Sequence, residues 1–275
     1  MTQLIGDRLV VAGQTDVGCV RTLNEDCYLI DDRTGLLLVA DGMGGHEAGE
    51  VASARVVELM RNSLASALNS PLPQQTLPTQ ASGSIEHDPD LPTLDDLPNP
   101  VTHMVRHAIV AANADVNRTN QDKGFENGTG MGTTLVGLWL PPFSDHPVVF
   151  HVGDSRLYRY RKQQLVQVTR DHSMYQQWLA MGKKGPRPAQ NILLQAIGPA
   201  KNLTPDVHLL EMVSGDVILL CSDGLHGMVG QDVLSRTLDK ADPNNLDRIA
   251  KELIELAKAG GGKDNVTLIV GMFIK

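Results

Sequence analysis

The sequence predicts an α+β fold in which antiparallel sheets are covered by helices. Short segments rich in Val, Leu, Ile and aromatic residues have the composition of strands. The strands come in clusters and the helical segments in separate pairs, whereas a parallel α/β fold alternates the two regularly. No Gly-rich linker or internal repeat divides the chain, so we expect one domain over residues 1–275.

The predicted strands are short apolar runs, many of which are bounded by Gly, Asp or Asn. They lie at residues 8–18, 27–31, 35–41, 133–140, 147–154, 157–161, 206–212, 216–224 and 265–273. The run at 35–41 reads as a buried strand that ends abruptly in a carboxylate.

Helices are predicted for three segments. Residues 47–68 and 101–118 carry apolar side chains three or four positions apart, which places each set on one helical face. A third helix is expected to start at Asp242, which can cap it, and to stop at Gly260.

The first two helices are separated by a proline-rich stretch. Residues 71–100 hold seven of the 15 prolines and acidic residues without any Lys or Arg. Such a segment can form neither a regular helix nor an alternating strand. We therefore expect a flexible insertion at about 69–100.

Composition excludes several classes of protein. The net charge of −8 and the absence of basic clusters argue against a nucleic-acid partner. The apolar runs are far too short to span a membrane and the N-terminus lacks a signal-peptide pattern, so we expect a cytoplasmic monomer without membrane contacts. Cys19, Cys27 and Cys221 have no CxxC spacing, which indicates reduced thiols.

Aspartates stand at the ends of several predicted strands. Asp41, Asp154 and Asp223 each follow an apolar run, and Asp264 directly precedes one. If the last strand is antiparallel to the strand at 216–224, Asp264 and Asp223 fall at the same end of a sheet. These acids, distant in sequence, are thus expected to gather at one rim.

Gathered carboxylates repel one another unless a cation lies between them. Mg²⁺ and Mn²⁺ take oxygen ligands, and a glycine such as Gly42 lets a carbonyl or a water approach closely. For Asp41 and Gly42 alone, ordinary turn chemistry is the alternative interpretation.

A further polar segment precedes the strand at 27–31. Arg21 offers a planar fork suited to binding phosphate through two hydrogen bonds. Glu25 and Asp26 are placed to orient waters around a metal ion. A surface ion pair for Arg21, and a solvated turn for Glu25 and Asp26, are the alternatives.

Taken together, these segments resemble the metal-dependent protein phosphatases, the type 2C serine/threonine phosphatases, in their compact bacterial form. The resemblance rests on ordered motifs that span nearly the whole chain: RxxNED (21–26), DGMGGH (41–46), GTT (132–134), GDSR (153–156), DHS (171–173), SDGL (222–225) and KDN (263–265). It implies a four-layer α-β-β-α sandwich of two antiparallel sheets flanked by helix pairs.

The resemblance also implies a ligand set for two Mn²⁺ or Mg²⁺ ions and a weaker third. Asp41 would bridge two ions, with the carbonyl of Gly42 on one of them. Asp223 and Asp264 would complete the second site, and Asp154, together with Asp223, would form the third.

Other residues receive supporting roles from the same resemblance. Glu25 and Asp26 would hold metal-bound waters, with Asn265 behind them, and Arg21 would hold the substrate phosphate. The nucleophile would be a hydroxide that bridges the metals and is activated by Asp41 and Asp223. No cysteine nucleophile is then required, and the chain has no CxxxxxR motif.

The resemblance does not directly identify the residue that donates a proton to the leaving group. Family members with a DGH motif use that histidine, but Met43 stands here. His46, three residues on, is a candidate for the role, and a solvent-facing position at a helix start is the alternative. For His172 we expect a structural role, since a lone histidine beside a turn is usually hydrogen-bonded.

Residues 175–198 resemble the mobile flap of bacterial members. Lys183, Lys184 and Arg187 would suit an acidic or phosphorylated protein surface. An ordinary solvated loop is the alternative interpretation.

The sequence therefore predicts a serine/threonine protein phosphatase that acts on phosphorylated proteins and opposes a cognate bacterial Ser/Thr kinase system. A catalytically silent, phosphoprotein-binding relative of the same fold is the alternative. It would be expected to lack a metal aspartate, and Asp41, Asp154, Asp223 and Asp264 are all present. A calcium-binding protein would need a DxDxDG loop, and the sequence has none.

Overall fold

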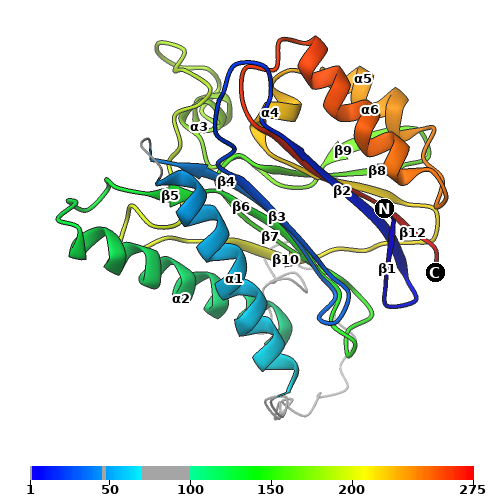
Figure 1. Cartoon of the computed structure of the whole chain (residues 1–275), viewed down its shortest axis with the longest axis horizontal. Helices are drawn as coiled ribbons and strands as arrows, with labels where there is room; N and C mark the ends of the chain where they lie inside the picture. Colours follow the sequence, from blue (N-terminus) through cyan, green and yellow to red (C-terminus); the bar gives the residue numbers. More distant parts are fainter. Residues whose placement is uncertain (1, 45–47, 70–98) are drawn as a thin grey trace, which may run out of the picture.

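The computed structural model describes residues 2–44, 48–69 and 99–275. His46 and residues 70–98 of the predicted insertion lie outside these ranges. Within the described residues, the strands form two antiparallel sheets that pack face to face (Figure 1).

The first sheet contains the strands from both ends of the chain. Its order is β1 (Gln3–Ile5), β2 (Leu9–Asp16), β12 (Val266–Phe273), β11 (Val217–Cys221), β8 (Arg156–Arg161) and β9 (Gln164–Gln167). β11 and β12 pair antiparallel, with Cys221 opposite Leu268, which is the strand direction assumed in placing Asp223 and Asp264 at one end of a sheet.

The second sheet is built from the central part of the chain. Its order is β10 (Asp206–Leu209), β7 (Val148–Val152), β6 (Leu135–Trp139), β4 (Leu36–Met43) and β3 (Asp26–Asp31), and the short β5 (Gly132–Thr133) pairs with the end of β4.

Helices cover the outer face of each sheet. The helices are α1 (Gly49–Leu68), α2 (Pro100–Asp122), α3 (Met174–Ala180), α4 (Asp223–His226), α5 (Gln231–Leu238) and α6 (Leu246–Ala259). α1 and α2 lie on the second sheet, and α4, α5 and α6 lie on the first (Figure 1). The predicted four-layer α-β-β-α sandwich is confirmed.

The burial of β4 explains its continuous apolar run. Leu37 and Val39 face the core between the two sheets, whereas Leu36, Leu38 and Ala40 face α1 and α2. Because successive side chains of a strand point to opposite faces, a strand covered on both faces is apolar at every position. The polar residue that ends this run, Asp41, is carried to the end of the sandwich.

The predicted helix boundaries agree with the structure to within about two residues, with two exceptions. α2 continues past residue 118 to Asp122, and it begins where the side chain of Asn99 accepts a hydrogen bond from the N–H of Val101. The third predicted helix starts at Leu246, not at Asp242. The carboxylate of Asp242 accepts a hydrogen bond from the N–H of Asn244 in the preceding turn, so the capping signal belongs to that turn.

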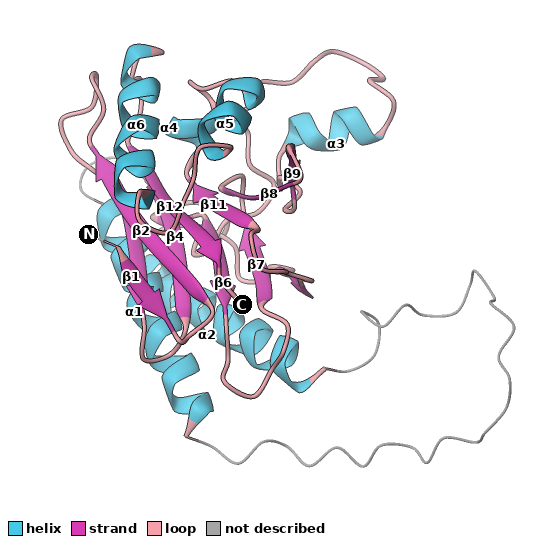
Figure 2. Ribbon diagram, turned by 90° about the vertical axis from the view of Figure 1, so that its right-hand side faces the viewer, coloured by secondary structure: helices cyan, strands magenta, loops and turns pink. Residues whose placement is uncertain are grey.

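The sequence patterns did not predict β1, β9 or α3 to α5. β1 and β9 are very short, and α4 is a single turn directly after β11. α3 lies at one end of the sandwich, away from α1 and α2 (Figure 2). In the part of the chain that the structure describes, no helix is both apolar and long enough to cross a bilayer.

Candidate metal centre

The predicted aspartates meet at one end of the sandwich. Asp26 at the start of β3 pairs in register with Asp41 near the end of β4. Asp223 follows β11, Asp264 precedes β12 and Asp154 follows β7. All of these except Asp26 line one cavity of about 310 Å³. The expectation that these acids share one rim is therefore confirmed by the fold.

The main chain of Asp41 is held from the side by the GTT motif. Its N–H donates to Oγ1 of Thr134 at 3.1 Å, and its carbonyl accepts from the N–H of Thr134 at 2.8 Å. Oγ1 of Thr133 also donates to that carbonyl, at 2.9 Å. Oγ1 of Thr134 in turn lies 2.7 Å from Oγ of Ser155, next to Asp154. The carboxylates of Asp41 and Asp154 are thus positioned by one hydrogen-bonded unit.

The glycines beside the aspartates are required by close backbone packing. A Cβ on Gly42 would lie 2.2 Å from the carbonyl oxygen of Gly49 and 2.5 Å from that of Glu25. A Cβ on Gly224 would lie 1.9 Å from the carbonyl oxygen of Asn265. Each glycine therefore lets a neighbouring main-chain carbonyl approach closely. A carbonyl was one of the two groups, with water, whose approach the sequence led us to expect.

Asn265 organises the loop that carries Arg21 and Glu25. Its Oδ1 accepts from the N–H of Glu25 at 2.8 Å, and its Nδ2 donates to the carbonyls of Val17 and Leu23. The side chain is almost fully buried. Its amide is thus engaged on both sides and fixes the loop against the start of β12.

Arg21 lies at the edge of the cavity and forms an ion pair with Asp264, with Nη2 and Oδ2 2.8 Å apart. Both side chains are partly exposed, at 48% and 37%. The guanidinium is therefore next to the cluster of carboxylates and accessible from solvent.

Burial disfavours the charged form of the clustered aspartates. It raises the pKa of Asp41 well above its usual value and the pKa values of Asp26 and Asp154 to about 7. The pKa of Asp223 is also raised, by burial and then by repulsion from Asp264. A cation among these groups would restore their charged forms.

One further observation tests whether the residues fit a divalent metal ion. Oδ2 of Asp26 accepts a hydrogen bond from Oγ of Ser222 at 2.8 Å, but its buried Oδ1 accepts none from any described residue. Buried polar atoms are normally satisfied, so this oxygen is available to a water or an ion. An all-oxygen set of carboxylates fits Mg²⁺ or Mn²⁺ better than softer metals.

Comparison with known proteins identifies the family. Residues 20–257 match protein phosphatase 2C. The chain belongs to the protein phosphatase 2C family. It is 30% identical over 266 residues to protein phosphatase PhpP of Streptococcus pneumoniae, covering 92% of this chain and 93% of PhpP. It is also 30% identical over 265 residues to serine/threonine phosphatase stp of Listeria monocytogenes, covering 94% and 93% of the two chains.

Solved structures of phosphatases have the same fold. The Mycobacterium tuberculosis serine/threonine phosphatase PstP/Ppp superposes with a TM-score of 0.76 at 29% identity, covering 98% of this chain and all of that one. The catalytic domain of PstP in complex with two manganese ions gives a TM-score of 0.75 at 30% identity, over 98% and 99% of the chains. This chain is accordingly a serine/threonine protein phosphatase that depends on a divalent metal ion.

The segment at 175–198 contributes residues to the cavity that the sequence did not single out. Asn191 and Leu193 line it, beside the aspartates. An isolated bridge between Ser173 and Leu193 closes the segment at its base. Asn191 and Leu193 are single loop residues without a periodic sequence pattern. Their position at the cavity therefore follows only from the fold.

Two motifs of the phosphatase also bind each other. Arg156 of GDSR donates two hydrogen bonds to the carboxylate of Asp171 of DHS, at 2.9 and 2.7 Å. His172 faces Asp206 rather than the cavity, in agreement with the structural role expected for it.

Proposed function

We propose that the cavity holds two Mn²⁺ or Mg²⁺ ions and a weaker third, and that the chain removes phosphate from phosphoserine and phosphothreonine in proteins. The observation that carries this proposal is the cluster of strand-end aspartates whose pKa values burial raises. The names of the relatives support the same substrate class.

The ligands in this proposal are the residues expected from the sequence. Asp41, the carbonyl of Gly42, Asp223 and Asp264 would hold the two core ions, and Asp154 would hold the third together with Asp223. When bound, such ions supply a water of lowered pKa as the nucleophile and neutralise charge on the phosphate.

The surrounding residues orient the reactants. Glu25 lines the cavity, and Asn265 fixes its main chain, so its carboxylate is placed to accept a hydrogen bond from a water there. Oδ1 of Asp26 is buried and has no hydrogen-bond partner among the described residues, so it would be available to a water held by a bound ion. Arg21 would release Asp264 to a metal ion and turn its fork to the substrate phosphate.

We propose His46 as the proton donor to the leaving oxygen, on the basis of its position in the sequence alone.

The proposed partners are phosphorylated proteins and a cognate Ser/Thr kinase system. The chain is proposed to act in the cytoplasm as a monomer with one catalytic domain. The flap at 175–198, next to the cavity, would contact the protein substrate.

A silent, phosphoprotein-binding role is the second candidate from the sequence. It is disfavoured because Asp41, Asp154, Asp223 and Asp264 all line the same cavity. A binding module would gain nothing from retaining buried carboxylates that destabilise one another.

Phosphate release from a phosphothreonine peptide tests the proposal. We expect turnover with Mn²⁺ to survive treatment with N-ethylmaleimide, because no thiol acts as the nucleophile. Cys221 is buried and its pKa is raised to about 12, and burial also raises the pKa of Cys27. Cys19 is exposed, so the Cys19→Ser variant is the control for incidental alkylation. Inactivation by the reagent of a variant that carries both Cys19→Ser and Cys27→Ser would argue against metal-dependent attack by water.

Replacing Arg21 with Ala should weaken substrate binding more than it slows the chemical step. A lost charge-assisted hydrogen bond is worth roughly 1.5 to 3 kcal/mol, which corresponds to a KM raised about 10- to 100-fold. Arg21→Lys keeps the charge without the fork and should give an intermediate KM. Steady-state kinetics on the phosphothreonine peptide separate KM from kcat. An unchanged KM in both variants would place the phosphate elsewhere.

A further inference from the structure

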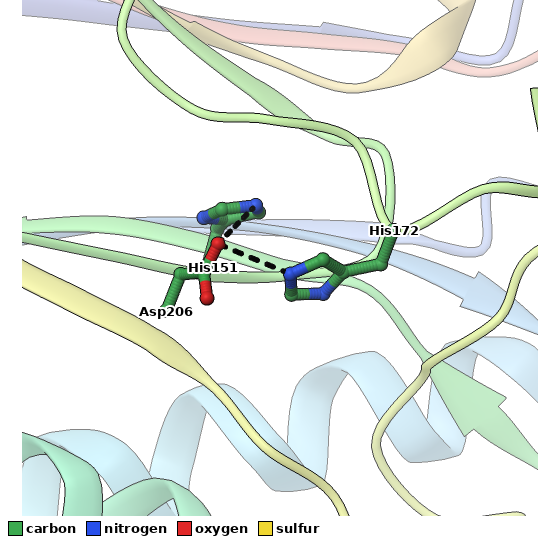
Figure 3. Close-up of side chains that lie close together, drawn as sticks. All are labelled: His151, His172 and Asp206. Carbon is green, nitrogen blue, oxygen red and sulfur yellow. Dashed lines mark ion pairs between the residues drawn. The ribbon is translucent and has the colours of Figure 1, made fainter. Parts of the chain in front are cut away.

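A cluster of two histidines and one aspartate lies next to the metal cavity but outside it. Figure 3 shows His151 from β7, His172 from the segment before α3 and Asp206 from β10. Oδ2 of Asp206 lies 3.3 Å from Nε2 of His172 and 3.8 Å from Nε2 of His151. The two imidazole rings stack with their centroids 4.5 Å apart.

The hydrogen bonds of His172 determine its tautomer. Nδ1 accepts a hydrogen bond from the N–H of Gly153 at 3.3 Å, so this nitrogen carries no proton. The proton of the neutral ring is then on Nε2, where it faces the carboxylate of Asp206. Asp206 therefore stabilises the one tautomer that can accept from Gly153.

The same hydrogen bonds argue against a metal ion in this cluster, although its donor atoms lie within 4.8 Å of one another. A histidine that binds a metal through Nε2 usually donates a hydrogen bond through Nδ1–H. In His172, Nδ1 instead faces the N–H of Gly153. Nε2 of His151 lies 2.8 Å from the carbonyl of Arg170, to which it donates. Both rings are thus used as hydrogen-bonding groups.

His172 holds the main chain at two places that border the metal cavity. Its N–H donates to the carbonyl of Gly153 at 2.8 Å, in addition to the bond at Nδ1. Its carbonyl accepts from the N–H of Leu194 at 2.8 Å, next to Leu193 in the cavity wall. Gly153 precedes Asp154, and its φ of +102° is open to glycine but rarely to other residues.

We propose that Asp206 is a positioning residue for Asp154: it fixes the orientation of His172, which holds Gly153 and thereby directs the Asp154 carboxylate into the cavity. The part of this inference that concerns metal binding rests on the proposed function, in which Asp154 holds the weaker third ion. Asp206 touches neither the metal cavity nor, on this account, the substrate. Its effect passes entirely through His172 and the main chain of Gly153.

The experiment compares Asp206→Ala with Asp206→Asn, because the Asn amide oxygen can still accept from Nε2–H whereas Ala cannot. Asp206 is about half exposed, so neither change should unfold the protein. Asp145→Ala, at an exposed position on the loop before β7, is the matched control.

The first readout does not depend on activity. Long-range ¹H–¹⁵N spectra of the metal-free protein should show His172 with its proton on Nε2 in wild type, Asp206→Asn and Asp145→Ala. In Asp206→Ala we expect a mixture of tautomers and a shifted Gly153 amide resonance. An unchanged tautomer and amide resonance in Asp206→Ala would overturn the proposal, whether or not the protein proves to be a phosphatase.

The second readout is the Mn²⁺ dependence of turnover. Asp206→Ala should need about 10-fold more Mn²⁺ for full activity, as is usual when a supporting hydrogen bond behind a metal ligand is lost, while the tight sites measured by calorimetry stay unchanged. Asp206→Asn should stay close to wild type. Equal Mn²⁺ dependence in wild type and Asp206→Ala would contradict the link to Asp154. Stoichiometric Zn²⁺ binding in excess Mg²⁺, if lost in Asp206→Ala, would instead identify the cluster as a metal site and overturn the positioning role.

Discussion

Replacement of Asp41 with Asn is expected to abolish turnover of every substrate while the fold is retained. Asp41 lies at the centre of the carboxylate cluster, and Asp26, Asp223, Asp154 and Asp264 all act on its pKa. A ligand between two ions contributes several kcal/mol to the transition state, so we expect kcat to fall about 10³-fold or more.

The folded structure of this variant should be at least as stable as metal-free wild type. The main-chain hydrogen bonds of Asp41 to Thr133 and Thr134 do not involve the side chain. Asn also removes a buried group whose charged form is disfavoured. Circular dichroism and thermal melts in EDTA test stability, and phosphate release tests turnover, with Asp145→Asn as the exposed control. A kcat within tenfold of wild type in a folded Asp41→Asn protein would show that Asp41 is not a bridging ligand.

The metal-free phosphatase is expected to lose stability as the pH rises from about 6.5 to 8.5. The pKa values of Asp26 and Asp154 are raised from 3.8 to about 7 in the folded protein, so the folded state binds protons that the unfolded state has already released. Stability therefore falls as the pH rises through the folded pKa, by on the order of 1 kcal/mol for each group over this interval. Asp41 and Asp223 act in the same direction.

The histidines set the lower limit of this interval. Burial lowers the pKa values of His151 and His226 to about 4, so their contribution to stability rises between about pH 4 and 6.5 and opposes that of the carboxylates. The histidines of the unfolded chain finish losing their protons by about pH 7.5, so above that pH the carboxylates determine the slope.

Denaturant unfolding in EDTA at pH 6.5 and 8.5 measures this effect. Mn²⁺ should restore the stability at pH 8.5, because a ligand that binds only the folded state stabilises it. Asp154→Asn should have a smaller loss between the two pH values than wild type. Equal or greater stability of the metal-free protein at pH 8.5 would mean that the carboxylates are not forced together as the structure places them.

Sequence patterns predicted the strands that carry the site aspartates, because apolar runs are a strong signal for buried strands. The apolar run that ends at Asp41 is buried on both faces of β4, and the antiparallel pairing of β11 with β12 brings Asp223 and Asp264 together. These are local patterns plus one assumption of strand direction.

The residues that sequence patterns could not place act through contacts between loops. Asn191 and Leu193 reach the cavity only because the segment after α3 returns to form a bridge between Leu193 and Ser173. The Arg156–Asp171 pair and the Asp206–His172 pair each join separate segments whose spacing carries no periodic signal. The start of α6 was misplaced for a different reason: the Asp242 capping signal served a turn.

Calorimetric titration of Mn²⁺ into metal-free wild type and Asp41→Asn tests most directly whether the aspartate cluster is the catalytic metal centre. We predict two tight sites in wild type, with phosphate release absent from the metal-free protein and appearing as these sites fill. Asp41→Asn should lose tight binding and turnover together. Two tight ions retained in Asp41→Asn, or full turnover by the metal-free wild-type protein, would contradict the assignment of the catalytic centre to these residues.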